Sequence, residues 1–237
     1  MSLSDSPRMP MENRLLAALP SEVTACLEPN LERVSLPLKE VLYESRELIE
    51  YVYFPNHGVV SLLTILEDGV LAEVGLVGNE GIVGLPVFLG IEVTPFKAIV
   101  QVPGEAMRMK ADVFKDLVNL DTPLHGLLMR YTHTLMFQIS QSAACNPHHS
   151  VKERCCRWLL MTRDRMHSDQ FPLTHEFLSQ MLGVRRASIT VVAGMLQKAE
   201  LIRYSRGQMT IKDRLGLEAV SCQCYRLVKE EEDRLQA

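Results

Sequence analysis

The segment spanning residues 171–204 constrains the fold most, because it contains two short helical patterns joined at a single glycine. Thr174 precedes the first pattern and can cap a helix through its hydroxyl group. The apolar side chains of this first helix follow at helical spacing: Phe177, Leu178, Met181 and Leu182. Gly183 can adopt the left-handed backbone that lets a second helix cross the first. The second helix then buries a stripe at i, i+3, i+4 and i+7, formed by Ile189, Val192, Ala193 and Leu196.

A β-hairpin is expected directly after the second helix. Two short strand patterns, Leu201–Tyr204 and Gln208–Ile211, flank a turn at residues 205–207, and Arg203 and Arg206 place positive charge near its tip. The second helix, predicted over about 185–198, exposes a face opposite its apolar stripe: Arg185, Arg186, Ala187, Ser188, Thr190 and Val191. A helix-turn-helix followed by a basic hairpin, or wing, predicts a domain that places this helix in the major groove of DNA.

Charge is distributed unevenly along the 237 residues. Residues 150–214 carry 12 Lys and Arg against 6 Asp and Glu, a net charge of +6. Residues 1–149 carry 10 Lys and Arg against 18 Asp and Glu, a net charge of −8. A basic segment inside an acidic protein predicts a polyanionic partner for that segment, although an uneven scatter of surface charge is the alternative.

The N-terminal half has the pattern of a β domain. Between Ser35 and Met109, short runs of Val, Ile, Leu and Tyr alternate with turn residues, which include 55–58 and Pro103-Gly104. The predicted strands include Tyr51–Phe54, Gly58–Ile65, Val70–Val77 and Lys97–Val102. Helical patterns precede them over Asn13–Leu19 and over Ser21–Val34, with an interruption at Pro29. We interpret this half as one β-roll.

The pattern then becomes helical. Helices are predicted over Ala111–Asn119, from Pro123 to Cys145 with an end at Asn146-Pro147, over Val151–Met166, and within Asp213–Ala237. The long helix has an apolar stripe with coiled-coil spacing: Leu124, Leu128, Tyr131 and Leu135. We predict a dimer interface along this stripe, while a helix packed on its own β-roll would show a similar pattern.

This order of elements resembles the Crp/Fnr family of bacterial transcription regulators. The resemblance covers about residues 12–215 and is sharpest in Leu173–Ile211 and Val77–Val102. It implies an α+β fold whose parts are a cyclic-nucleotide-binding-like β-roll sensor at 13–120, a dimerisation helix at 121–146 and a winged helix-turn-helix DNA-binding domain with a C-terminal helix at 147–237. Residues 1–12, polar and rich in proline, are expected to be a disordered tail. The partners implied are an inverted-repeat double-stranded DNA operator, a second copy of the chain in a homodimer, and RNA polymerase.

The resemblance also implies roles for single residues of the second helix. Arg186 is expected to read a guanine through its bidentate guanidinium group. Many members have a glutamate after this arginine, whereas this chain has Ala187, and Val191 occupies a position that is often basic. Both side chains could contact thymine methyl groups. Contacts with phosphates, which fix position and not sequence, are expected from Thr174, His175, Ser188 and Thr190.

The β-roll lacks the residues that hold a cyclic nucleotide in relatives that bind one. In those relatives a glutamate contacts the ribose and a later arginine pairs with the cyclic phosphate. Leu85 or Pro86 stands at the first position here, and Phe96 at the second. Lys97 is adjacent, but neighbours in a strand point to opposite faces. Because a buried phosphate without a cation is costly, we predict that the β-roll senses an unknown signal other than cAMP.

The cysteines match no zinc or iron–sulfur motif. Cys222 and Cys224 are two apart, and no second pair of cysteines supports them. Cys145 precedes His148 and His149 at the hinge after the long helix, where polar hinge residues and a half-buried thiol are favoured over a metal or redox site. Vicinal Cys155-Cys156 are interpreted as core residues and Cys26 as isolated. No metal site, cofactor or catalytic residue is therefore predicted.

Other function classes fit less well. A cupin-like enzyme would need clustered His and Glu ligands, yet His57 is the single histidine between Ser35 and Met109. A cyclic-nucleotide-binding adaptor, whose C-terminal half would have a packing role without binding DNA, would need the glutamate and the arginine that the β-roll lacks. RNA binding would need an aromatic stacking platform, for which Tyr204 is the one nearby candidate. Neither an apolar run of about 18–20 residues nor a secretory signal is visible, so a cytoplasmic location without membrane contact is expected.

Overall fold

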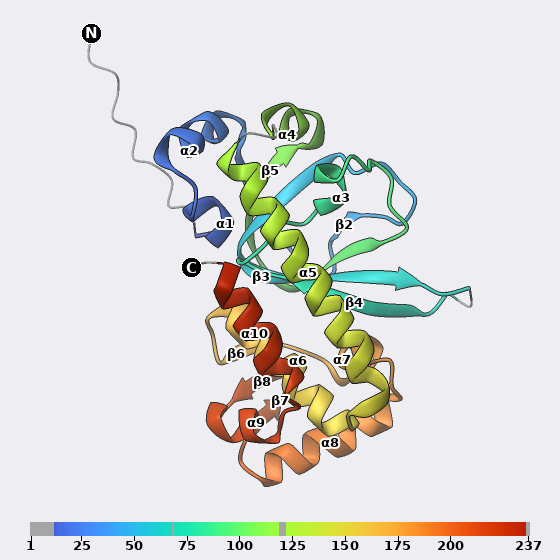
Figure 1. The fold of residues 1–237 in the computed structure, drawn as a ribbon. Coiled ribbons are helices and arrows are strands. Elements are labelled where there is room, and N and C mark those ends of the chain that lie inside the picture. Colours follow the sequence, from blue (N-terminus) through green and yellow to red (C-terminus); the bar gives the residue numbers. More distant parts are fainter. Residues whose placement is uncertain (1–11, 68, 119–121, 236–237) are drawn as a thin grey trace.

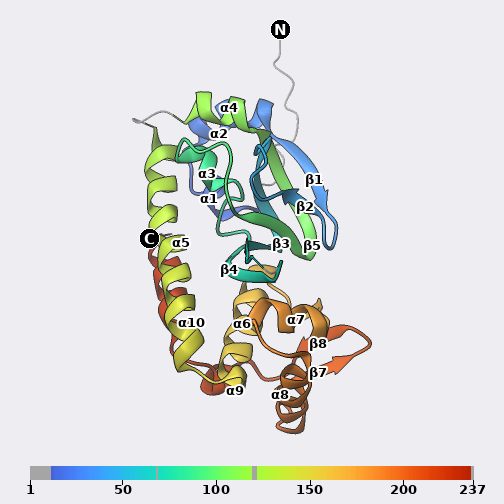
Figure 2. The same ribbon diagram turned by 90° about the vertical axis from the view of Figure 1, so that its right-hand side faces the viewer.

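The computed structural model describes residues 12–67, 69–118 and 122–235, so all but Glu12 of the predicted disordered tail lies outside it. A β-roll forms one lobe and a helical domain with a small sheet forms the other, and helix α5 (Pro123–His148) connects them (Figure 1). Helix α10 (Cys224–Leu235) lies against α5 and runs back towards the β-roll (Figure 2). The predicted α+β fold is confirmed. Within the described ranges, no helix combines the length and hydrophobicity that crossing a membrane requires.

The chain enters the β-roll through α1 (Arg14–Ala17), α2 (Ser21–Leu27) and a 3₁₀ turn, η1 (Glu28–Asn30). Buried Asn13 caps α1 and donates hydrogen bonds to the carbonyl groups of Pro55 and Gly81, which anchors this entry segment on the roll. The helical pattern predicted to Val34 is wrong beyond η1. Residues Glu32–Leu36 instead form strand β1, which pairs with β5, because pairing with the sheet overrides a locally amphipathic sequence.

The antiparallel sheet has the order β1-β5-β3-β4, and β2 also pairs with β5. Its other strands are β2 (Val41–Tyr43), β3 (Tyr51–Ile65), β4 (Leu71–Val77) and β5 (Lys97–Lys110). The turns predicted at 55–58 and at Pro103-Gly104 are wrong, because β3 and β5 continue through them. The register shifts between Pro55 and Val60, Gly58 has a φ of +102°, and a Cβ on Gly104 would collide with the backbone of β3. These residues form bulges in long strands.

Short helices complete the roll, α3 (Leu85–Phe88) and α4 (Ala111–Leu117), the second close to its predicted range. Thr122 then caps α5 by accepting a hydrogen bond from the N–H of His125. The helix continues through Pro147 to His148, past its predicted end, because the N–H of His149 still reaches the carbonyl of Cys145 at 3.0 Å.

The apolar stripe of α5 is buried within the chain itself. Its members pack in the core of the β-roll and expose 6% or less of their surface: Leu124, Leu128, Tyr131 and Leu135. They therefore leave no surface for a partner, which corrects the dimer interface predicted on them. The spacing indicated correctly that this face is buried, but the face packs on the roll, as the alternative interpretation held.

The C-terminal lobe follows the predicted order closely. Ser150 and Glu153 form a capping box at the start of α6 (Val151–Met166). The next elements are β6 (Gln170–Pro172), α7 (His175–Leu182), α8 (Arg186–Lys198), β7 (Ile202–Ser205), β8 (Gln208–Ile211), α9 (Arg214–Val220) and α10. Strand β6 was not predicted and pairs with β8. The single helix expected after Asp213 is two helices, with a break at residues 221–223.

The lobes share an apolar core in which strands β3, β4 and β5 meet α6, α7 and α8. Its members from the sheet are Val59, Leu63, Leu76 and Val102, and those from the helices include Trp158, Leu159, Met181 and Leu182. Continuous burial of this kind holds the two lobes in one arrangement.

Glu73 of β4 is the polar centre of this interface. Its carboxyl group accepts a hydrogen bond from Trp158 Nε1 at 2.9 Å and lies 2.7 Å from Ser61 Oγ, which also lies 2.5 Å from Gln101 Oε1. Ser61 has one proton to donate, so a protonated Glu73 that donates to Ser61 satisfies all three groups. Although the residue keeps some exposed surface, its carboxyl group is enclosed. Burial raises the pKa of Glu73 to about 7, and this effect exceeds the lowering effect of its hydrogen-bonding contacts with Ser61 and Trp158.

We predict that Glu73→Gln makes stability less dependent on pH. Because the pKa of Glu73 rises from its ordinary 4.5 to about 7 on folding, the neutral acid stabilises the fold fully below pH 4.5. That contribution is lost as the pH rises through 7, and glutamine should keep the fold closer to its low-pH stability. Some slope should remain from Glu232, whose burial also raises its pKa to about 7.

Urea unfolding between pH 4.5 and pH 7 measures how the free energy of unfolding depends on pH. Glu22→Gln, at an exposed residue of α2, is the control. Equal pH slopes for the native chain and Glu73→Gln would show that Glu73 is ionised throughout the interval.

Candidate functional site

Helices α7 and α8 form the predicted helix-turn-helix. Thr174 caps α7 by accepting a hydrogen bond from the N–H of Phe177 at 3.1 Å. Gly183 has φ 61° and ψ 41°, the predicted left-handed conformation, and the N–H of Val184 reaches back to the carbonyl of Ser179. This is a helix end closed by glycine, and it turns the chain sharply into α8.

Helix α8 buries one face and exposes the other. The buried stripe is as predicted: Ile189, Val192, Ala193 and Leu196. The opposite face is exposed or half-buried and contains all the residues predicted there: Arg185, Arg186, Ala187, Ser188, Thr190 and Val191. Arg185 precedes the helix as its N-cap without a side-chain cap. The free N–H groups and the dipole at this end favour an anion.

The wing has the predicted hairpin geometry. Strands β7 and β8 pair from Ile202↔Ile211 to Ser205↔Gln208, which leaves Arg206-Gly207 as a two-residue turn. Their φ angles of +50° and +78° are those of a type I′ turn, whose twist matches the flanking strands. Arg203 and Arg206 are exposed.

His175 of α7 connects that helix with α8 and with the wing. Its ring stacks on Tyr204 of the wing with centroids 4.3 Å apart, and its Nδ1 lies 3.2 Å from Thr190 Oγ1 of α8. Burial lowers the pKa of His175, and the positive charge of Arg186 lowers it further, so the ring is neutral near pH 7. Its Nε2 is buried and has no hydrogen-bond partner among the described residues. The ring therefore braces the surface, and the role of Tyr204 in this brace was not foreseen from sequence.

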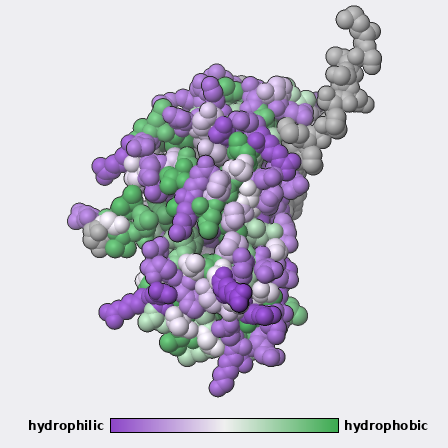
Figure 3. Space-filling view, turned by 180° about the vertical axis from the view of Figure 1, so that it is seen from behind, coloured by the Kyte–Doolittle hydropathy of each residue, from purple (hydrophilic) through white to green (hydrophobic). Residues whose placement is uncertain are grey.

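Positive charge on this surface is largely uncompensated. Within the described part of the chain, no carboxylate lies within ion-pair distance of Arg185, Arg203 or Arg206. Arg186 lies 3.9 Å from Glu176, but both side chains are more than half exposed, so this pair is weak. In the space-filling view, hydrophilic side chains project from this lower lobe (Figure 3). The surface can accept a polyanion without first breaking strong ion pairs.

The β-roll contains a cavity of about 220 Å³ against α5. Its lining is almost entirely apolar: Tyr43, Leu62, Val74, Ile82, Gly84, Leu85, Pro86, Leu89, Phe96, Thr132, Leu135, Met136 and Ile139. No charged residue is among them. Lys97 does not line the cavity, as expected, and instead pairs with Glu44 at 2.8 Å; Phe96, which does line it, precedes strand β5 and is not a strand neighbour of Lys97. The cavity offers no cation to a phosphate.

Comparison with known proteins agrees with this architecture. Residues 33–121 match the family model of the cyclic nucleotide-binding domain, and residues 153–220 match that of the Crp-like helix-turn-helix domain. A sequence search of curated proteins gives no match.

Among solved structures, the chain is similar to FixK2 from Bradyrhizobium japonicum, with a TM-score of 0.68 and 16% identity over 81% of this chain and 98% of that one. It is also similar to a CRP-family regulator from Thermus thermophilus, with a TM-score of 0.67 and 18% identity over 79% and 96% of the two chains. The c-di-GMP responsive regulator CLP from Xanthomonas campestris has a TM-score of 0.60 and 15% identity over 82% and 100%.

Identities this low show a shared fold, whereas the two family models identify both domains directly and in the same chain. The protein belongs to the Crp/Fnr family of transcription regulators.

Proposed function

We propose that the protein is a homodimeric, sequence-specific DNA-binding regulator that acts in the cytoplasm and whose β-roll responds to a signal other than cAMP. The observation that carries the proposal is the exposed N-terminal face of α8, flanked by arginines without strong ion pairs, in a segment of net charge +6. A helix N-terminus with this charge is suited to the major groove and the phosphates beside it.

The residues of this surface divide into two roles. Arg186 has an exposed guanidinium group that suits the O6 and N7 atoms of guanine, and Ala187 and Val191 are exposed beside it to meet thymine methyl groups. Phosphate contacts are proposed for Thr174, Arg185, Ser188, Thr190, Arg203, Arg206 and the N-terminal backbone of α7 at His175. Because the His175 ring is engaged with Thr190 and Tyr204, its side chain positions neighbouring groups in this proposal.

A dimer would use the outer face of α5, which differs from the predicted one. Met129, His133, Met136 and Ser140 are exposed and spaced by four, three and four residues, as in a coiled-coil seam. Met129 and Met136 expose 51% and 63% of their surface, unusually much for methionine. Two such helices side by side would relate two DNA-binding lobes by a two-fold axis and read an inverted repeat, from which the dimer could contact RNA polymerase.

The cavity supports a ligand other than a cyclic nucleotide. Its apolar lining would leave a cyclic phosphate without a cation, which is costly for a phosphate taken out of water. The alternative function, a cyclic-nucleotide-binding adaptor, is disfavoured by the same lining. A small apolar effector, or regulation through protein abundance alone, agrees better with this geometry.

We predict that Arg186→Ala weakens DNA binding and relaxes the sequence preference at the guanine that Arg186 reads. Loss of a bidentate contact with guanine costs about 1–3 kcal/mol per half-site, which corresponds to roughly 5–150-fold weaker binding. Selection from random duplexes, followed by sequencing, should enrich an inverted repeat with the native chain, and the variant should no longer select guanine at one position of each half-site. Arg226→Ala removes an exposed arginine of α10, outside the proposed DNA surface, and is the matched control. An identical enriched motif with Arg186→Ala would contradict the assigned role.

We predict no binding of cAMP or cGMP at micromolar concentrations. The physical reason is the absence of a cation from the cavity lining. Titration with a fluorescent cyclic nucleotide measures this directly, and Phe96→Arg, which returns a cation to the cavity, is an informative second variant. Saturable micromolar binding by the native chain would contradict the proposal.

We predict that Met129→Glu weakens the dimer at least about tenfold, because two like charges would meet in the proposed seam without a partner. Sedimentation velocity over a concentration series measures the monomer–dimer equilibrium. Leu215→Glu makes the same change at a residue of α9 that is 76% exposed, and it should leave the equilibrium unchanged. A monomeric native chain, or an unaffected Met129→Glu dimer, would rule out this interface.

A further inference from the structure

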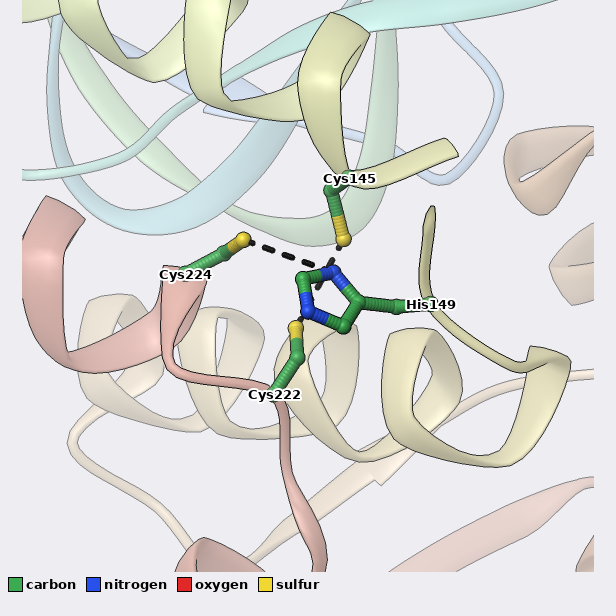
Figure 4. Close-up of side chains that lie close together, drawn as sticks. All are labelled: Cys145, His149, Cys222 and Cys224. Atoms are coloured by element: carbon green, nitrogen blue, oxygen red, sulfur yellow. Dashed lines mark hydrogen bonds between the residues drawn. The ribbon is translucent and has the colours of Figure 1, made fainter. Parts of the chain in front are cut away.

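Four potential metal ligands converge at the junction between the long helix and the DNA-binding lobe (Figure 4). Cys145 lies in the last turns of α5 and His149 directly follows that helix. Cys222 lies in the break between α9 and α10, and Cys224 is the first residue of α10. The three cysteines are buried and His149 is half-buried. Their sulfur and nitrogen atoms all lie within 4.8 Å of one another.

Two of the separations between these atoms match a tetrahedral site around one ion, and the others are at most 4.8 Å. Zinc bonds of about 2.3 Å to sulfur and about 2.0–2.1 Å to nitrogen place two sulfurs about 3.8 Å apart and a sulfur and a nitrogen about 3.6 Å apart. Cys145 Sγ and Cys222 Sγ are 3.5 Å apart, and Cys224 Sγ and His149 Nδ1 are 3.7 Å apart. A disulfide would use only two of these groups. An iron–sulfur cluster binds its cysteines on separate iron atoms, whereas these ligands converge on one point.

The surroundings of the four ligands provide balancing charge. Arg154 and Arg157 of α6 are buried, and among the described residues neither has a carboxylate within ion-pair distance. The Nε atom of each also lacks a hydrogen-bond partner there. Both arginines interact electrostatically with Cys145 and Cys222. Unpaired buried cations are costly, and a site of three thiolates, one neutral imidazole and one divalent ion carries a net charge of −1 that would offset part of the +2 of the two arginines.

We propose that Cys145, His149, Cys222 and Cys224 bind one Zn²⁺ ion as a structural site. Thiolates with one imidazole in tetrahedral array are the ligands that zinc prefers in such sites. Four protein ligands fill the coordination sphere, so the ion has no open position for a substrate and serves the fold.

The site would fix the hinge between the lobes. Cys145 and Cys222 are separated by 77 residues, and His149 directly precedes Ser150, the cap of α6. One ion would thus join the end of α5, the start of α6 and the start of α10. From sequence alone, polar hinge residues are favoured here because the cysteine spacings match no zinc motif. The chain nevertheless contains a Cys-x-x-x-His pair at Cys145 and a Cys-x-Cys pair at Cys222, far apart along its length. Their combination is the signal that could have indicated the site.

The first test is metal analysis of the full-length chain, expressed in zinc-supplemented medium without a histidine tag. We expect one zinc ion per chain in the native protein, and a loss to background in Cys222→Ser and His149→Gln. Cys26→Ser, at an exposed cysteine, and Cys155→Ala, at a buried cysteine outside the cluster, are the controls and should keep their zinc. Zinc at background level in the native chain, or undiminished in Cys222→Ser, would overturn the proposal.

Cobalt substitution provides a second test that needs no variant and is therefore independent of variant folding. The native chain, stripped of metal under reducing conditions and titrated with Co²⁺, should develop the visible bands of a tetrahedral ion and thiolate-to-metal charge transfer, both saturating at one equivalent. Zn²⁺ should then displace the cobalt. Weak octahedral bands alone, or a Cys145–Cys222 disulfide in the mass spectrum of the metal-free native protein as isolated, would reject a zinc site.

Discussion

Arg165 of α6 is the residue through which the two lobes are held in register. Its guanidinium group pairs with Glu80 of the β-roll at 2.9 Å and with Glu232 of α10; Arg165 and Glu80 are buried, and Glu232 is half-buried. Burial acts to lower the pKa of Arg165, but Glu232 and Glu80 outweigh it and raise that pKa, so the arginine remains charged. Removing one partner of such a network leaves an uncompensated buried charge and is strongly destabilising. The network therefore specifies one relative placement of roll, α6 and α10, which the apolar contacts alone would specify less sharply.

The same arrangement orients the proposed DNA-binding surface. Helix α6 contacts the roll through Trp158 and Glu73, and Arg154 of α6 donates a hydrogen bond to the carbonyl of Leu182 at the end of α7. The exposed face of α8 is thus connected to the roll by side chains that are themselves buried, over a short path. Its position relative to a second copy would then depend on how α6 leaves α5, which is the junction where the proposed zinc site lies.

The parts of the fold that could be predicted from sequence are those set by local chemistry. Thr174 and Gly183 define the ends of α7 by capping and by a positive φ, and both features are visible in the chain itself. The full lengths of β3 and β5 were not predicted, because Gly58 and Gly104 have the sequence pattern of turn residues. In the structure these glycines instead let the two strands approach each other closely, which depends on residues far apart in the chain. The α5 stripe showed that a face is buried without showing against what. The convergence of Cys145 with Cys222 depends on the packing of α10 along α5, and no local pattern contains it.

Helix α10 explains how these features act together. It is held at its start by the cluster that contains Cys224, and near its end by the ion pair of Glu232 with Arg165. Between these points it packs along α5, so the hinge and the roll are braced by one element. The cavity lies close to this brace, since Ile82 lines it and Glu80 stands two residues earlier in the chain. A molecule that enlarged the cavity would press on the segment that carries Glu80. Because Glu80 pairs with Arg165 of α6, this ion pair connects the roll beside the cavity to α6, from which Arg154 reaches the end of α7.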